Sequence, residues 1–194
     1  AAPSTAGLLR NSGLLRKPHA AEFGKALALY RRRDAHPDSE AAQSFRREHS
    51  HEVEIAFIGV WDTVGALGIP GFRGLGFRKK LYAFHDVELS GRVRRAYQAL
   101  ALDERRKPFA PSVWEAKPKD GQVVEQVWFA GVHSAVGGGN PDTGLSGVAF
   151  QWMLERAEGC GLAFDDEALR AFVRPDPLGS LHDNGPWRFA PVKH

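Results

Sequence analysis

Two short apolar runs dominate the hydrophobic pattern of this chain, at 55–60 (IAFIGV) and 123–129 (VVEQVWF). Both are rich in β-branched and aromatic residues, and polar or glycine-containing segments border them. The continuous apolar run at 55–60 is typical of a strand that is covered on both faces, as in a parallel sheet, and 123–129 is rich in residues that favour strands. The pattern therefore predicts two buried strands.

Helices are predicted where apolar residues recur at i, i+3, i+4 and i+7. Three segments have this spacing: Phe23, Ala26, Leu27 and Tyr30; Val93, Ala96, Tyr97, Leu100 and Ala101; and Leu145, Val148, Ala149, Trp152 and Met153. Further helices are predicted at 5–16 and 165–172. The polar segment 34–50 is predicted to be an exposed loop, and 175–194 a loop-like tail. Alternating strands and helices predict an α/β fold, a partial parallel sheet flanked by helices.

Composition and charge narrow the range of functions. With 194 residues and 43% hydrophobic residues, the chain is one ordinary domain or a large part of one. The net charge of +3 comes from basic clusters with acidic residues close by, which favours solvated faces over nucleic-acid binding, with peripheral membrane contact as the second interpretation. One cysteine, Cys160, excludes an internal disulfide framework and a cysteine-rich zinc site. We predict neither a metal nor a cofactor.

The same pattern gives little information about compartment. No apolar run is long enough to span a bilayer, and the first residues show no signal-peptide pattern. Both a cytoplasmic location and export without a classical signal peptide are compatible with this sequence.

Two residues that could carry chemistry stand just after the predicted strands: Asp62 and His133. Ligands of open α/β sheets bind beyond the carboxyl ends of the strands, so both side chains are expected at the functional edge. An acid followed by a histidine is the order in which an α/β-hydrolase delivers its last two triad members. We therefore expect Asp62 and His133 to approach each other. The alternatives are an aspartate that caps its own turn and a structural, hydrogen-bonded histidine.

The glycines at 137–139 allow a third interpretation, an anion-binding loop ahead of a helix. No Lys-Ser or Lys-Thr pair follows them, and the chain has neither a G-x-G-x-x-G nor a Walker motif, so a tight turn beside His133 is favoured. A G-x-S-x-G nucleophile motif is also absent, since none of Ser12, Ser134 and Ser146 has glycine both two residues before and two residues after it.

Four motifs together resemble one family: 59–70 (GVWDTVGALGIP), 99–106 (ALALDERR), 127–133 (VWFAGVH) and 136–139 (VGGG). They are similar to the α/β-hydrolase-like domain of unknown function found in bacteria and fungi, a family that includes phospholipase effectors of type VI secretion systems. The resemblance covers roughly residues 4–181.

The resemblance implies a Ser-Asp-His hydrolase of lipase or esterase type, with Asp62 as triad acid and His133 as triad base. The segment 4–10 (STAGLLR) resembles the helix that follows the family's nucleophile elbow. Residues 1–194 are therefore expected to be the C-terminal portion of a single α/β-hydrolase-like domain, with the elbow upstream of Ala1. Ala135 stands where the family typically has an aspartate.

A catalytically inactive binding or scaffold module is the alternative function. The missing elbow and Ala135 favour this alternative, whereas the presence of both Asp62 and His133 disfavours it. In either case the chain alone is expected to lack turnover. Its strand edge is expected to be covered by the N-terminal half of a parent chain or by self-association.

Overall fold

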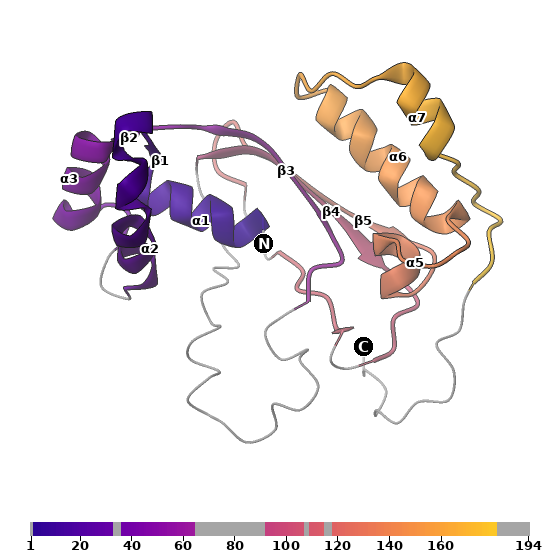
Figure 1. The fold of residues 1–194 in the computed structure, drawn as a ribbon. Helices are drawn as coiled ribbons and strands as arrows, with labels where there is room; N and C mark the ends of the chain where they lie inside the picture. Colours follow the sequence, from indigo (N-terminus) through magenta and orange to yellow (C-terminus); the bar gives the residue numbers. More distant parts are fainter. Residues whose placement is uncertain (1, 33–35, 65–91, 107–108, 115–117, 182–194) are drawn as a thin grey trace.

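A computed structural model describes residues 2–32, 36–64, 92–106, 109–114 and 118–181 of the chain (Figure 1). Its centre is a sheet of three parallel strands, β3 (Ile55–Trp61), β4 (Val93–Ala101) and β5 (Val123–Phe129), with β4 in the middle. The predicted α/β class, a parallel sheet flanked by helices, is confirmed.

Helices and a small strand pair surround this sheet. The helices are α1 (Ala2–Ser12), α2 (Phe23–Arg31), α3 (Glu40–His49), α5 (His133–Gly137), α6 (Gly144–Glu158) and α7 (Asp166–Phe172), with a 3-10 helix, η1, at Lys17–Glu22. The strands β1 (Leu14–Leu15) and β2 (Ser50–His51) form an antiparallel pair. The predicted helices around Phe23 and at 145–153 correspond to α2 and α6. Asp165 caps α7, because its side chain accepts a hydrogen bond from the Ala168 N–H.

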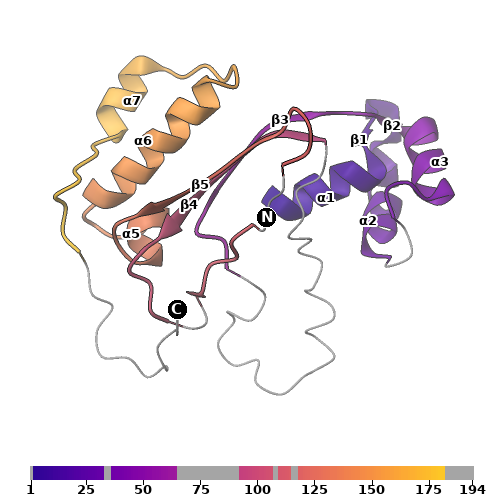
Figure 2. The same cartoon turned by 180° about the vertical axis from the view of Figure 1, so that it is seen from behind.

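The two faces of the sheet are covered by different helices. On one face Ala6 of α1 packs with Ile58 and Val60 of β3. On the other, Val136 of α5 and Met153 of α6 pack against the sheet. Figures 1 and 2 show the α1–α3 group and the α6–α7 pair on either side of the sheet. Burial is fullest in the central strand β4, whereas β3 buries Ile58 and Val60 and no residue of β5 is buried, so the prediction of two buried strands is wrong for β5.

The segment at Val93–Ala101 was predicted to be a helix, and this prediction is wrong: it is the central strand β4. Helical spacing arises there without a helix because Val93 and all of 96–101 are buried, so apolar residues occur at nearly every position. Gln98, which is fully buried, interrupts the apolar run that would have indicated a strand. Its Nε2 donates to the Ser112 carbonyl at 2.9 Å.

The segment 34–50 was predicted to be an exposed loop, and most of it is the helix α3. Ser39 begins the helix, since its hydroxyl accepts a hydrogen bond from the Ala42 N–H. Arg46 of this helix is buried and donates to the carbonyl oxygens of Asn11 and Pro37 at 2.9 and 2.7 Å. The segment looks solvated in the sequence because its two buried positions hold a small alanine, Ala42, and an arginine, Arg46.

The remaining predictions concern the termini and loops. Residues 173–181 form neither helix nor strand, in agreement with the predicted tail, whereas 182–194 lie outside the described residues, as do 65–70 of the first family motif. In the part of the chain that the structure describes, no helix is long and apolar enough to cross a membrane.

Candidate active site

The first element of the site is Asp62, directly after β3. Its backbone has φ 37°, a left-handed conformation that aspartate tolerates better than most residues. The Asp62 N–H donates to the Ala99 carbonyl at 2.6 Å, and Oδ1 accepts from the Ala101 N–H at 2.9 Å. The end of the neighbouring strand β4 thus fixes both the backbone and the carboxylate, which is fully buried.

His133, the first residue of α5, completes the pair. Its Nδ1 lies 2.6 Å from Asp62 Oδ2, and 32% of its side chain is exposed. The expected approach of the two residues at one sheet edge is therefore found. An ionised carboxylate fixes the tautomer with the proton on Nδ1, and this leaves Nε2 to accept a proton from another group. The carboxylate is buried and the imidazole reaches the surface, which is the arrangement that general-base chemistry requires.

The loop between β5 and α5 is held by residues that follow β4. Gly131 N–H donates to Asp103 Oδ2 at 2.7 Å, and Asp103 N–H donates to the Gly131 carbonyl at 3.1 Å. The backbone N–H of His133 donates to Glu104 Oε2 at 3.3 Å. The periodicity of the sequence did not single out Asp103 or Glu104, although both fall in the 99–106 motif of the family resemblance.

Glu104 is itself paired with Arg106. The Arg106 Nε and Nη2 atoms lie 2.9 and 2.7 Å from the two carboxylate oxygens, and the Arg106 N–H also donates to Oε1. Burial alone would raise the pKa of Glu104, but the hydrogen bonds from Arg106 and from the His133 N–H together bring it below its usual value. Glu104 is therefore a buried anion at neutral pH.

This shift in pKa predicts how stability depends on pH. A lowered folded-state pKa means that the ionised Glu104 stabilises the native state above its unfolded pKa of about 4.5, and that this contribution is lost as the pH falls through the folded value. Urea unfolding between about pH 3 and pH 6 should show a steeper loss of stability in the unsubstituted chain than in Glu104→Gln. Equal slopes for the two chains would contradict this prediction.

The glycines at 137–139 end α5, and Gly138 and Gly139 have φ values of 86° and 114°. They form a turn, as predicted, between α5 and the segment that leads into α6. Ala135, where the family typically has an aspartate, is buried with Val132 and Leu145. In this chain the position is therefore part of a small apolar cluster beneath the loop of His133.

Gly131 is expected to tolerate no side chain. It has φ 112°, and a Cβ built on it would lie 2.6 Å from the Ala135 Cβ. Gly131→Ala should lower the free energy of unfolding by about 2–4 kcal/mol, the sum of left-handed strain and overpacking. Gly121→Ala is the matched control, since Gly121 has φ 72° and a Cβ there would meet only Arg94 Nη1 within 4 Å, at an ordinary contact distance of 3.8 Å, so it should show the strain alone. Equal losses in denaturant unfolding would show that the contact with Ala135 is unimportant.

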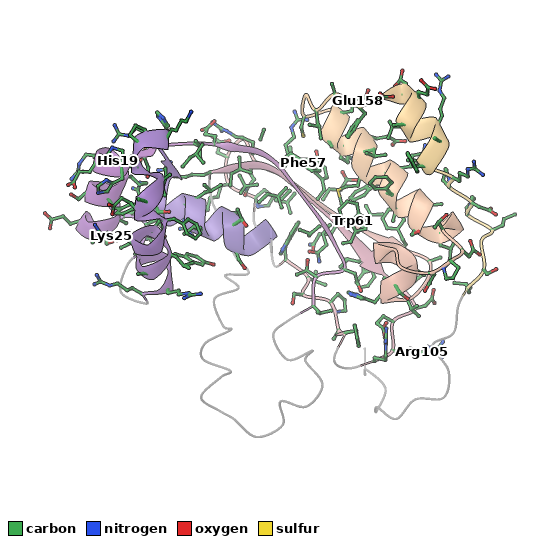
Figure 3. All side chains as sticks on the ribbon, viewed as in Figure 1. His19, Lys25, Phe57, Trp61, Arg105 and Glu158 are labelled. Carbon is green, nitrogen blue, oxygen red and sulfur yellow. The ribbon has the colours of Figure 1, made fainter. Side chains whose placement is uncertain are left out.

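An apolar pocket of about 340 Å³ lies between α5, α6 and α7, and neither Asp62 nor His133 is among the residues that line it. Trp61, which precedes Asp62, and Val136 of α5 line it together with Phe150 and Phe172. Figure 3 labels Phe57 and Trp61 along β3, and both side chains pack in the cluster on the face of the sheet that α6 covers. Among the described residues, no group of three or more His, Cys, Asp or Glu side chains could hold a metal ion.

The fold and the site define an α/β protein with a carboxylate–imidazole pair at the carboxyl edge of a parallel sheet. Residues 1–156 match the family model described as "T6SS, Phospholipase effector Tle1-like, catalytic domain". The chain therefore belongs to the Tle1-like family of type VI secretion phospholipase effectors. No curated protein and no solved structure matched it.

Proposed function

We propose that the chain is part of a serine hydrolase that cleaves phospholipid esters, with Asp62 as the acid and His133 as the base of its triad. The observation that carries the proposal is the 2.6 Å contact between His133 Nδ1 and Asp62 Oδ2. A buried carboxylate bound to the inner nitrogen of a partly exposed imidazole is the geometry of a catalytic base. The match of residues 1–156 to a phospholipase catalytic domain supports the substrate class.

The nucleophile of this proposal is a serine on an elbow that precedes α1. The amino-terminal half of α1 packs on the carboxyl-terminal half of β3, through Ala6 with Ile58 and Val60. The other end of α1 is held near the start of β3, because Arg46 joins the Asn11 carbonyl to Glu52. The amino terminus of α1 therefore points toward the sheet edge that holds Asp62 and His133. A serine just before this helix would lie on the side of the sheet where the base is found.

The reaction follows from these positions. The serine Oγ attacks the ester carbonyl carbon while His133 Nε2 takes the hydroxyl proton, and Asp62 stabilises the imidazolium. Collapse of the tetrahedral intermediate breaks the ester bond, and the alcohol leaves with the proton from Nε2. Water then attacks the acyl-enzyme with His133 again as base, releasing a fatty acid and restoring the serine.

The alternative is an inactive binding module, and hydrolysis of phospholipid vesicles by the protein that carries the elbow distinguishes the two. Release of fatty acid and lysophospholipid, detected by mass spectrometry, should be abolished by His133→Gln. His36→Gln is the matched control, because His36 lies 3.4 Å from a carboxylate oxygen of Asp38 but both side chains are exposed. Undiminished hydrolysis by His133→Gln would contradict the proposal.

We also propose that the outer edge of β3 pairs with another strand. In the part of the chain that the structure describes, β3 pairs with β4 alone, so its other edge presents backbone groups that can bind a further strand. The partner would be an N-terminal strand of the same protein or a second copy of the chain. Light scattering of the 194-residue chain should therefore show self-association. A monomer that unfolds cooperatively would contradict this proposal.

A further inference from the structure

The backbone of His133 has an unusual hydrogen-bond partner. His133 is the first residue of α5, and the preceding Val132 provides no side-chain cap for the helix. The first N–H groups of a helix have no partner within the helix. Glu104, from the segment after β4, fills this role for His133 at 3.3 Å. A fully buried carboxylate side chain thus sets the position of the His133 backbone from a neighbouring strand end.

The ring of His133 is held by the same group of residues. The Phe109 ring lies 5.2 Å from the imidazole, centroid to centroid, at an angle of 58°. The Arg106 guanidinium carbon lies 3.8 Å from the centroid of the same Phe109 ring. Arg106 therefore joins the carboxylate that holds the backbone of His133 to the aromatic ring that contacts its side chain.

The segment that carries Phe109 is anchored to all three strands. Ser112 N–H donates to the Thr63 carbonyl at 2.7 Å, next to Asp62 at the end of β3. The Ser112 carbonyl accepts a hydrogen bond from the side chain of Gln98 in β4. The backbone N–H and carbonyl of Trp114 each form a hydrogen bond with the side-chain amide of Gln126 in β5. Phe109 is thus part of a segment whose backbone is fixed close to both members of the pair.

We propose that Glu104, Arg106 and Phe109 are positioning residues, here called the histidine clamp, which keep His133 Nδ1 on Asp62. Glu104 accepts a hydrogen bond from the backbone of His133, and Phe109 contacts its ring. Arg106 contacts both Glu104 and Phe109 and so fixes their positions. The inference concerns the geometry of the pair, and its relevance to catalysis rests on the proposed function. A ring that rotates away from Asp62 would lose its defined tautomer, so the clamp would determine how often Nε2 is ready to accept a proton.

The test follows the proton shared by His133 and Asp62, which can be measured without any turnover. In the ¹H NMR spectrum this proton should give a resonance far downfield that is lost in both His133→Gln and Asp62→Asn. In Glu104→Gln and Arg106→Lys its exchange with solvent should be faster by about tenfold, the factor for weakening one hydrogen bond by about 1.4 kcal/mol. Phe109→Leu should show a smaller change in the same direction.

The chain offers a matched control for this chemistry. Arg156 binds both carboxylate oxygens of Glu125, at 3.0 and 3.2 Å, and its guanidinium lies over the Trp152 ring. This second glutamate–arginine pair joins β5 to α6 and does not contact His133. Glu125→Gln and Arg156→Lys should therefore leave the exchange rate unchanged, although they also remove or alter a bidentate ion pair.

Several results would overturn the inference. The inference would be overturned if the shared proton exchanged at the wild-type rate in folded Glu104→Gln and Arg106→Lys. It would also be overturned if Glu125→Gln and Arg156→Lys accelerated this exchange equally. Absence of the resonance from the unsubstituted chain would also overturn it, because the clamp would then not hold the pair together. If Glu104→Gln does not fold, Arg106→Lys and Phe109→Leu decide the question. If the exchange rate depends on the clamp residues but the protein does not hydrolyse esters, the inference about the clamp stands and only the proposed function is contradicted.

Discussion

Asp62→Asn is expected to lower kcat for phospholipid hydrolysis about 10³- to 10⁴-fold, in the protein that carries the nucleophile, because an amide favours the wrong tautomer of the catalytic histidine. Asparagine also tolerates the backbone of this position, where φ is 37°, and it keeps an oxygen for the Ala101 N–H. The substituted protein should therefore remain folded. Measurements of kcat and KM together with circular dichroism test this expectation.

Asp62→Ala separates the catalytic from the structural role of the same side chain. Alanine leaves the buried Ala101 N–H without its acceptor and is strained at positive φ, so it should cost about 1–3 kcal/mol more in the free energy of unfolding than asparagine does. Both variants should lose similar activity. An active Asp62→Asn protein would show that Asp62 is a turn residue rather than the acid of a triad.

Leu100→Ala should destabilise the chain by about 2–5 kcal/mol, because the substitution leaves a cavity in the central strand. Leu100 is fully buried in β4, whereas Leu102, two residues further on, is 58% exposed. Leu102→Ala is therefore the matched control and should change the free energy of unfolding by less than about 1 kcal/mol. Denaturant unfolding followed by circular dichroism measures both. A Leu100→Ala chain as stable as the control would contradict the burial of Leu100 in the core.

The sequence predicted those elements in which the arrangement of apolar residues is typical of the element that forms. The strands β3 and β5 were predicted from short segments rich in apolar and β-forming residues, and the helices α2 and α6 from apolar residues at helical spacing. The strand β4 was predicted to be a helix because most of its positions are buried, so that its apolar residues also fit helical spacing, and because the buried Gln98 interrupts its apolar run. The helix α3 was missed because its two buried positions hold only a small alanine, Ala42, and an arginine, Arg46, whose partners include carbonyl oxygens of distant segments.

The sequence likewise indicated only some residues of the candidate site. Asp62 and His133 could be chosen because each follows a strand, and parallel strands bring their carboxyl ends to one edge. Glu104, Arg106 and Phe109 could not, since their roles depend on contacts between loops that no local pattern specifies. The family resemblance marked Glu104 and Arg106 only as members of a motif. Their function as partners of His133 required the distances in the structure.

The most direct measurement of the central claim is fluorophosphonate labelling of the protein that carries the segment before Ala1, followed by peptide mapping. The account predicts one adduct, on a serine of a G-x-S-x-G sequence before α1, and labelling that is lost in His133→Gln but retained in His36→Gln. An adduct on a serine within residues 1–194, or labelling that is independent of His133, would contradict the assignment of Asp62 and His133 as the acid and base of this hydrolase.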